Sequence, residues 1–493
     1  MLEGFVKWLG VLFVGWGLSG CVSPAGAAHG AGPDPEVRGV WLTTTANDHI
    51  ASPENTAETM RRLRAIGLNT VYVEAWKNGY TQFPSQTLKQ VIGVDRRPEL
   101  VKQDPGDPDG PLLARDLLGE AVIEAHRNGL MIIGWFEYGF MAAHKDTQNH
   151  LRQMYPQWLS RDQNGNEVAP NGFVWMNPLH PQPRRLLLDL ILEAVDRYDL
   201  DGVQLDDRIV WPYYTMGYDD FTVAWYRNEH GGKAPPSDPK DPEWMRWRAD
   251  KVNEYARQFV RELREKRPGL IVSLSPAPYP WCWENYLLEW PRWAAWEPGN
   301  SENTWWDEFI PQCYRYDWPA FKATWDQQLG ELRRAGAGGR VGDMLAGVLT
   351  TGSRPEPVPW ADLEQEIGHV RRTGGGGHVW WFSRGVLDEY PAEITAFYDV
   401  ARTGQADHPH RPSGWRAPSV VLARAGSGAW TTSALPAGRY RPIVRDSTGG
   451  PWTELDPLDH PGGVLRIEHA DGWAAVELLV DRRREMSHYP PNP

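Results

Sequence analysis

The feature that most constrains the fold of this chain is a regular alternation, from residue 36 onward, between short runs of β-branched or aromatic residues and longer stretches with helical periodicity. This alternation is typical of βα units, in which each strand joins one parallel sheet and a helix carries the chain back. Eight units predict a (β/α)8 TIM barrel over residues 36–400, with its functional groups at the carboxyl ends of the strands. The eight runs lie at residues 37–44, 69–76, 130–138, 201–207, 270–276, 308–316, 345–351 and 377–383.

The sequence changes character after the last of these units. Residues 401–414 combine Gly, Pro and polar residues and are predicted to be a linker, so that the barrel should fold without the C-terminal region. Residues 415–493 contain short alternating runs separated by Gly-rich turns, which predict a small C-terminal β-sandwich. Its role is open between carbohydrate binding and a packing or spacer function.

The first 20 residues are predicted to be a lipoprotein signal peptide. A short opening precedes an apolar run that is too short and too often interrupted by Gly for an ordinary membrane span. The tetrapeptide LSGC, ending at Cys21, resembles the bacterial lipobox, in which the cysteine thiol becomes diacylated. We therefore expect a lipid anchor on Cys21, a flexible tether over residues 21–35, and a place in the bacterial cell envelope facing the periplasm or exterior. A plain signal peptide cut after Ala28 is the alternative.

Composition narrows the class of ligand. The formal net charge of −13 and the lack of a concentrated basic segment argue against a nucleic-acid partner. The 27 Trp residues offer flat apolar faces that can stack on sugar rings, although most of them are expected to fill the core. The sequence does not indicate an oligomeric state.

Motifs for cofactors are absent at plausible positions. The chain has no P-loop, dinucleotide-binding glycine motif, HExxH or GxSxG, and its histidines lack ligand spacing. We therefore expect no cofactor and no catalytic metal, with a structural divalent ion near Asp206 and Asp207 as an open alternative. Cys282 and Cys313 lack CxxC spacing, so they are either buried free thiols or a disulfide pair in an exported protein.

The fourth run ends in the sequence DGVQLDDR, residues 201–208. Because side chains alternate along a strand, Gln204 and Asp206 point into the barrel while the apolar residues between them face the helices. A carboxylate at that position is costly to bury unless it is used or paired. Asp206 is therefore predicted to be catalytic, with a structural cap held by Arg208 as the alternative. Asp207 is either a second acid or a residue that orients the following loop.

Two neighbouring runs also end in acids. Glu74 follows the sequence VYV in the second run, and Glu137 follows WF in the third. Hydrolysis of a glycosidic bond uses one protonated carboxyl group and one ionised carboxylate, and close carboxylates separate their own pKa values. Both glutamates are therefore candidate catalytic residues, and either one could instead accept hydrogen bonds from a sugar.

Five segments together carry a family resemblance. RGVWLTT, GLNTVYVEAW, GWFEYGF, MNPLHPQPRRLLLDLILEAVDRYDLDGVQLDD and FIPQCYRY occur in this order between residues 36 and 398. They resemble the glycoside hydrolase-like family 10 of bacterial envelope proteins, which includes lipoproteins. The resemblance implies a (β/α)8 barrel. At least one member type, a divisome-localised hydrolase, cleaves peptidoglycan strands that have lost their stem peptides.

The resemblance also assigns site residues. The DD pair that follows DG in the family matches Asp206 and Asp207, its Asn-Pro turn matches Asn177, and its Pro-Gln turn matches Gln312. The chain departs from the family pattern at Arg208, where many relatives have an aromatic residue, and at the sequence EAW of residues 74–76, where they often have Gln-Val-Arg. The residues expected to bind substrate are Trp41, Trp76, Tyr138, Asn177, Arg208, Gln312, Tyr314 and Trp381.

These expectations define one main function and two alternatives. The main function is a lipid-anchored glycoside hydrolase that cleaves cell-wall glycan by carboxylate acid/base chemistry. The alternatives are a hydrolase of another polysaccharide and a non-catalytic scaffold that binds envelope polysaccharide. The acids at the strand ends favour an enzyme, because a protein that only binds glycan has little reason to place several carboxylates at one end of its barrel.

Overall fold

The computed structural model describes residues 34–103, 110, 112–426, 428–448, 450–468 and 472–486. The predicted signal peptide, Cys21 and nearly all of the predicted tether lie outside these residues. Within the described ranges, no helix is both long and apolar enough to cross a bilayer.

Eight parallel strands form the central sheet in the order β12, β11, β10, β7, β2, β1, β14, β13. Bridges from Phe309 to Met344 and from Gln312 to Gly347 join the two ends of this order, so the sheet closes into a barrel. The predicted barrel is confirmed, although the sixth strand is much shorter than expected because Pro311 has no N–H to donate. The strands are β1 Val37–Leu42, β2 Thr70–Glu74, β7 Met131–Phe136, β10 Gly202–Asp206, β11 Ile271–Ser275, β12 Glu308–Phe309, β13 Leu345–Leu349 and β14 Gly377–Trp381.

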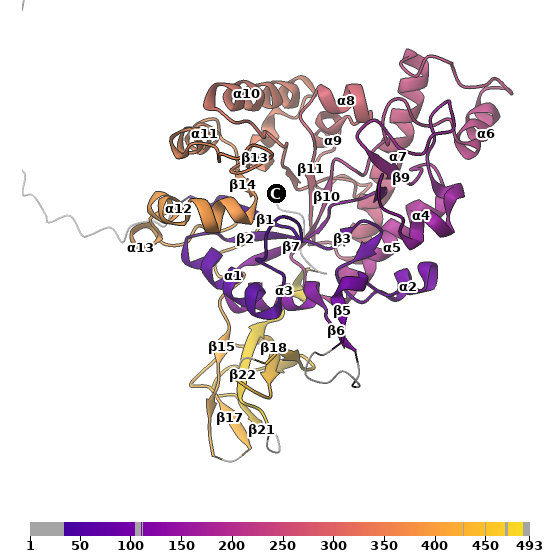
Figure 1. Cartoon of the computed structure of the whole chain (residues 1–493). Helices are drawn as coiled ribbons and strands as arrows, with labels where there is room; N and C mark the ends of the chain where they lie inside the picture. Colours follow the sequence, from indigo (N-terminus) through magenta and orange to yellow (C-terminus); the bar gives the residue numbers. More distant parts are fainter. Residues whose placement is uncertain are drawn as a thin grey trace, which may run out of the picture. The chain divides into compact units, whose positions relative to one another are not determined.

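Helices surround the barrel in Figure 1, and local sequence sets where they begin. Ser52, Asp116 and Asp317 each accept a hydrogen bond from a first-turn amide of the helix that they precede. Proline occupies the first turn of several of these helices, where its missing N–H costs nothing. The helices are α1 Pro53–Ala65, α2 Gln86–Ile92, α3 Leu117–Arg127, α4 His150–Met154, α5 Pro181–Arg197, α6 Asp220–Glu229, α7 Pro242–Lys266, α8 Trp281–Tyr286, α9 Trp290–Ala294, α10 Trp318–Arg334, α11 Trp360–Arg372, α12 Pro391–Tyr398 and α13 Val400–Thr403.

The barrel interior and the layer beneath the helices are separate apolar cores. Strand β10 has the expected alternation, since Val203 and Leu205 pack in the outer core. Gln204 points inward, where its Oε1 accepts from Trp41 Nε1 at 2.7 Å and its Nε2 donates to Ser273 Oγ at 3.0 Å. Both ends of the Gln204 amide are thus paired inside the barrel, as is typical of buried polar groups.

The connections that follow β2 and β7 contain short β-hairpins. They join β3 Trp76–Lys77 to β4 Tyr80–Thr81, β5 Val101–Lys102 to β6 Leu113–Ala114, and β8 Met141–His144 to β9 Phe173–Trp175. The long connection between β2 and β7 therefore contains two hairpins together with α2 and α3.

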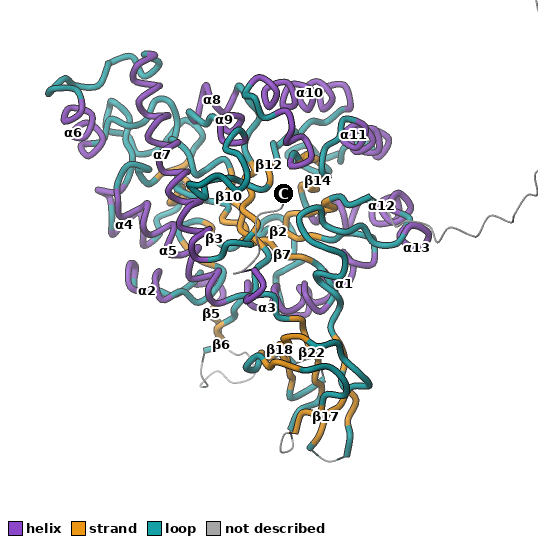
Figure 2. The backbone as a smooth tube through the Cα atoms, turned by 180° about the vertical axis from the view of Figure 1, so that it is seen from behind, coloured by secondary structure: helices purple, strands orange, loops and turns teal. Residues whose placement is uncertain are grey.

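The C-terminal region forms two antiparallel sheets, visible below the barrel in Figure 2. A shared apolar core that includes Trp430, Tyr440, Val476 and Leu478 agrees with the predicted small β domain. One sheet contains β15 Val420–Val421, β22 Ala475–Val480, β18 Gly438–Arg445, β19 Thr453–Glu454 and β20 Leu458–His460; the other contains β16 Ala423–Arg424, β17 Ala429–Thr431 and β21 Arg466–Glu468, and α14 Arg483–Met486 comes after β22.

Residues 401–414 connect the two parts, but they do not behave as the free linker that their composition predicts. His408 is 5 % exposed, and its Nε2 lies 3.3 Å from Glu308 Oε1 inside the barrel. Arg411 Nη2 donates to the carbonyl of Gly269. Trp415, which comes next, packs in the interior core of the barrel. The segment closes the amino end of the barrel because its aromatic and charged side chains find partners there.

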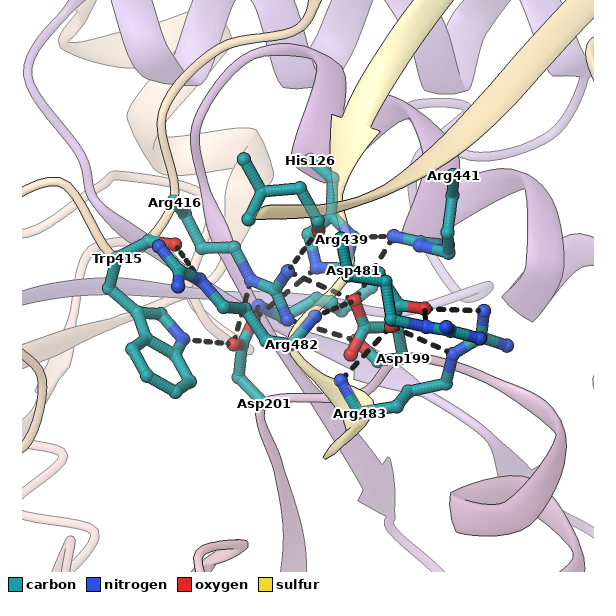
Figure 3. Close-up of polar contacts among 12 residues, drawn as sticks. His126, Asp199, Asp201, Trp415, Arg416, Arg439, Arg441, Asp481, Arg482 and Arg483 are labelled. Atoms are coloured by element: carbon teal, nitrogen blue, oxygen red, sulfur yellow. Dashed lines mark hydrogen bonds and ion pairs between the residues drawn. The ribbon is translucent and has the colours of Figure 1, made fainter. Parts of the chain in front are cut away.

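A buried ion network links the same end of the barrel to the C-terminal sheets (Figure 3). Asp201 Oδ1 accepts from Arg416 Nε at 2.8 Å and from Trp415 Nε1 at 2.9 Å. Asp199 Oδ2 lies 3.0 Å from Arg416 Nη1 and 3.2 Å from Arg441 Nη2. Both aspartates are at most 1 % exposed, so strand β10 begins with a charged anchor for the C-terminal domain.

Candidate active site

Asp206 ends β10, and four donors hold its carboxylate inside the barrel mouth. Oδ2 accepts from Arg208 Nη1 at 2.8 Å and from Trp135 Nε1 at 3.2 Å. Oδ1 accepts from Gln312 Nε2 at 2.6 Å and from the backbone N–H of Asp207 at 2.7 Å. The carboxylate is therefore fixed from three directions, by β7, by its own strand and by the segment after β12.

Burial dominates the ionisation of Asp206, which is 4 % exposed. It raises the pKa of this carboxyl to about 7, against the opposing charge of Arg208 and together with the charge of Asp207. A carboxyl group with such a pKa can carry a proton near neutral pH and release it within a reaction cycle, which is the requirement for a general acid.

Arg208 lies among three carboxylates. Besides Asp206, its Nη1 is 3.7 Å from Glu137 Oε1, and its Nε is 3.6 Å from Asp207 Oδ1. The backbone of Arg208 is fixed by Phe140, whose N–H donates to the Arg208 carbonyl at 2.8 Å. Gly139 has a φ of +46°, and a Cβ there would lie 2.4 Å from that carbonyl oxygen, so only glycine allows this approach.

Glu137 follows β7 and is 8 % exposed. Its Oε2 lies 3.0 Å from Lys77 Nζ. Burial raises the pKa of Glu137, and the charges of Lys77 and Arg208 act against that rise. Glu137 thus lies between two cations, which favour its ionised form at neutral pH.

Glu74, the last residue of β2, is fully buried and fully paired. Its two oxygens accept from Thr43 Oγ1, Thr44 N, Thr44 Oγ1, Gln82 Nε2 and Lys77 Nζ at 2.6–3.0 Å. Burial alone would raise the pKa of Glu74, but Lys77 and the threonine hydroxyls lower it. This geometry leaves Glu74 ionised and occupied in joining the loops after β1 and β2. It therefore favours a structural role over the predicted catalytic one.

An aromatic cluster forms the floor beside Asp206. Trp381, at the end of β14, has its ring centre 5.9 Å from that of Trp41, 6.0 Å from that of Trp135 and 5.7 Å from that of Tyr314. Trp41 and Trp135 are buried, whereas Trp381 and Tyr314 are partly exposed. Trp381 and Tyr314 are therefore the predicted binding residues that can present a ring to a sugar.

Three other predicted binding residues lie in structural positions. Trp76 is completely buried and donates from Nε1 to the carbonyl of Gly139 at 3.0 Å. Asn177 is 1 % exposed and donates to Asp219 Oδ1 at 2.8 Å. Tyr138 is 7 % exposed. Each was selected by its place near a strand end or by a family turn, and neither signal separates loop packing from substrate contact.

A pocket of about 340 Å³ opens next to Lys77, on the side of the mouth formed by the loops after β1, β2 and β7. Its lining is polar and includes Thr44, Asn78, Arg97 and Gln148. Arg97 Nη1 donates to Thr44 Oγ1 at 2.9 Å, which connects the pocket to the hydrogen bonds around Glu74.

Sequence reasoning missed Lys77 and Trp135, which hold Glu137 and Asp206 in place. Lys77 lies three residues after Glu74, and this short spacing was the available signal for an ion pair between them. Trp135 lies two residues before Glu137, and strand alternation points both side chains to the same face.

Two further chemical possibilities concern metals and thiols. Among the described residues, no group of three or more His, Cys, Asp or Glu side chains is arranged to hold a metal ion. Cys282 and Cys313 are both buried free thiols, and burial raises the pKa of each. A buried thiol with a raised pKa is a poor nucleophile.

The sequence is similar to a known protein family and to several of its members. Residues 36–342 match the family described as Glycosyl hydrolase-like 10. The chain is 26 % identical over 260 residues to glycosyl hydrolase YngK of Bacillus subtilis, covering 49 % of this chain and 45 % of the relative. It is 22 % identical over 263 residues to glycosyl hydrolase DigH of Escherichia coli K12, covering 49 % and 55 %. The chain thus spans about half the length of the curated relatives it matches.

Solved structures show the same barrel fold. The glycoside hydrolase domain of PgaB (BpsB) from Bordetella bronchiseptica superposes with a TM-score of 0.52 at 15 % identity, covering 75 % of this chain and 99 % of that domain. The catalytic domain of a β-amylase from Paenibacillus polymyxa gives a TM-score of 0.50 at 9 % identity, covering 76 % and 100 %.

Proposed function

Because this chain belongs to the glycosyl hydrolase-like 10 family, we propose that it is a glycoside hydrolase whose reacting groups are Asp206 and Glu137. The observation that carries the proposal is the contrast between these two buried carboxyls. Burial raises the pKa of both groups, to about 7 for Asp206, but Glu137 lies between two cations, Lys77 and Arg208, whereas Asp206 pairs with Arg208 alone. One group is suited to hold a proton and the other to stay ionised, which is the division of roles that glycoside hydrolysis needs.

The roles follow from this division. Asp206 donates a proton to the glycosidic oxygen as the bond to the leaving sugar breaks. Glu137 supplies negative charge to the developing oxocarbenium centre and can attack it. Trp381 and Tyr314 stack against the sugar, while Gln312 and Trp135 keep the Asp206 carboxyl oriented.

For the substrate, we propose cell-wall glycan, namely peptidoglycan strands without stem peptides. The support is the family resemblance together with an aromatic floor suited to sugar rings. We further propose that a lipid on Cys21 anchors the protein in the cell envelope, facing the periplasm or exterior. Replacement Cys21→Ser should then abolish fatty-acid labelling and release the protein from membranes, whereas a labelled variant would exclude this anchor.

A second candidate function is non-catalytic polysaccharide binding. The ion pair between Arg208 and Asp206 favours it, because the guanidinium occupies the oxygen that would otherwise face substrate. Catalysis requires the approaching glycan to displace one of the four donors, such as Arg208 from Oδ2, because these donors already use both lone pairs of each oxygen.

Release of soluble fragments from purified peptidoglycan, before and after amidase removal of the stem peptides, distinguishes these functions. We expect wild-type protein to solubilise the stripped glycan and Asp206→Asn to lose at least about 100-fold of that activity. Binding to the stripped glycan without any release would support the scaffold. Release from another polysaccharide alone would overturn the proposed substrate.

A further inference from the structure

A second aromatic group stands on the loops after β10 and β11. We define this aromatic rim as Tyr213, Trp281 and Tyr286. The ring centre of Tyr286 lies 5.2 Å from that of Trp281, at 89°, and 5.7 Å from that of Tyr213, at 83°. The rim rests on backbone hydrogen bonds between the two loops, from Trp211 N to the Tyr286 carbonyl at 3.2 Å and from Tyr214 N to the Asn285 carbonyl at 2.8 Å.

The rim adjoins the candidate active site. Tyr213 lies in the same connection after β10 as Asp207 and Arg208, and α8, which carries Trp281 and Tyr286, follows β11, the strand that pairs with β10. In the floor, Tyr314 lies two residues after Gln312, whose Nε2 donates to Asp206 Oδ1 at 2.6 Å. The carboxylates at the end of β10 therefore have one aromatic group close by in the floor and another in the rim.

Trp281 is unusual within this protein. It is the one exposed tryptophan in the described part of the chain, with 43 % of its surface accessible, whereas the others are buried or half-buried. Exposing a large apolar ring forgoes the stabilisation that burial would give. Tyr286 contacts the Trp281 ring edge to face, and 43 % of the Trp281 surface stays accessible. A ring that is exposed at the same end of the barrel as the reacting carboxylates can stack on a ligand.

We propose that the aromatic rim is an additional sugar-binding subsite, which holds a second ring of a linear polysaccharide whose scissile bond lies at Asp206. The apolar face of that sugar stacks on Trp281, and its hydroxyls reach the Tyr213 hydroxyl. The proposal rests on the proposed glycosidase function and adds to it. A site with the floor and the rim occupied together prefers polymeric chains to short oligosaccharides.

The test compares chain lengths with matched variants. The probes are peptidoglycan glycan strands stripped of stem peptides, used as a long-chain fraction and as tetrasaccharides. We expect Trp281→Ala to reduce kcat/KM for long strands about tenfold more than kcat/KM for tetrasaccharides. Trp281→Phe, which keeps a stacking face, should restore most of the loss. Trp225→Ala serves as the control, because this half-buried indole on α6 donates to Glu229 and lies outside the rim.

Binding in the Asp206→Asn background gives an independent readout without cleavage. Adding Trp281→Ala should weaken sedimentation with insoluble stripped peptidoglycan, whereas adding Trp225→Ala should not. Equal losses on long and short substrates, or no loss, would overturn the rim as a subsite while leaving the glycosidase function intact. Failure of wild-type protein to bind or cleave the glycan would instead overturn the proposed function, and the rim with it.

Discussion

Nη1 of Arg208, in the turn after β10, lies 2.8 Å from Oδ2 of Asp206, the last residue of that strand. The same nitrogen is 3.7 Å from Glu137 Oε1, so the two carboxylate oxygens are separated by no more than the sum of these distances, about 6.5 Å. Arg208 thereby holds together two acids from neighbouring strands whose side chains would otherwise repel each other. Both the acid/base roles and the product stereochemistry depend on this arrangement.

The acids at the barrel mouth should rank in importance for glycan cleavage. We expect Asp206→Asn and Glu137→Gln to lose the most activity, each about 100-fold or more, and Asp207→Asn to lose less. Glu74→Gln should act mainly on stability, because it leaves Lys77 and the four other donors poorly matched in a fully buried site. Fragment release and melting curves for the four variants check the ranking. A stable Glu74→Gln protein without activity would return Glu74 to the catalytic group.

The pKa of Asp206 predicts how stability depends on pH. Its folded-state pKa of about 7 lies above the ordinary value of 3.8, so the contribution to stability is fully present below pH 3.8 and is lost as pH rises through 7. Asparagine does not ionise, so the Asp206→Asn protein does not lose this stability as pH rises. The stability of the variant relative to wild type should therefore increase as pH rises from 4 to 8.

Denaturant unfolding of both proteins at several pH values measures this difference, with Asp459→Asn as the control for an exposed carboxylate. If the difference in free energy of unfolding between the two proteins were constant across the pH range, Asp206 would be ionised throughout and could not act as a general acid.

The separation of Asp206 and Glu137 predicts the stereochemistry of the products. Retaining glycosidases have carboxyl groups about 5–5.5 Å apart, whereas inverting enzymes need about 6.5–9.5 Å to admit a water molecule. The bound of about 6.5 Å on one pair of oxygens falls at the lower limit of the inverting range, and this close approach favours retention. We therefore expect the first product seen by NMR to keep the anomeric configuration of the substrate. Initial appearance of the opposite anomer would show that Glu137 is not the partner of Asp206.

The fold was predictable because it depends on patterns that repeat along the chain. Eight apolar runs separated by helical periodicity indicate a barrel, and alternation in β10 indicates that Asp206 points inward. The role of Glu74 was not predictable, because it depends on Thr43, Thr44 and Gln82, which come from different loops. A strand-end acid looks the same in sequence whether its oxygens are free or fully occupied.

The contacts at the amino end of the barrel could not be predicted from local sequence either. The Pro, Gly and His content of residues 401–414 is typical of a linker, yet His408 is buried against Glu308. Its partner lies about 100 residues earlier in the chain, so local composition could not identify the contact. The sequence likewise identifies Asp201 only as the start of the motif that leads to Asp206, although in the structure it anchors the C-terminal domain.

The ion network between β10 and the C-terminal domain yields the last prediction. Asp201 is fully buried, and its four hydrogen bonds come from Arg416, Trp415, His126 and the backbone of Ile132. Asp201→Asn leaves the Arg416 charge with less compensation in a dry site and should destabilise the protein by about 3–5 kcal/mol. Asp459→Asn, which breaks an exposed pair with Arg439, should cost about 1 kcal/mol or less.

The same network should make the protein sensitive to acid and to truncation. Burial would raise the pKa of Asp201, but Arg416 holds it well below its usual range, so this stabilisation is present above pH 3.8 and is lost as pH falls further. Burial lowers the pKa of His126 to about 4, so its contribution begins to disappear already as pH falls below 6.5. A chain ending at residue 404 lacks Trp415, Arg416 and Arg441, so Asp199 and Asp201 lose these partners, and we expect the chain to be insoluble or to melt well below the full-length protein. Recovery of a soluble barrel with full-length stability would show that the C-terminal domain is a separable module and that the network contributes little to folding.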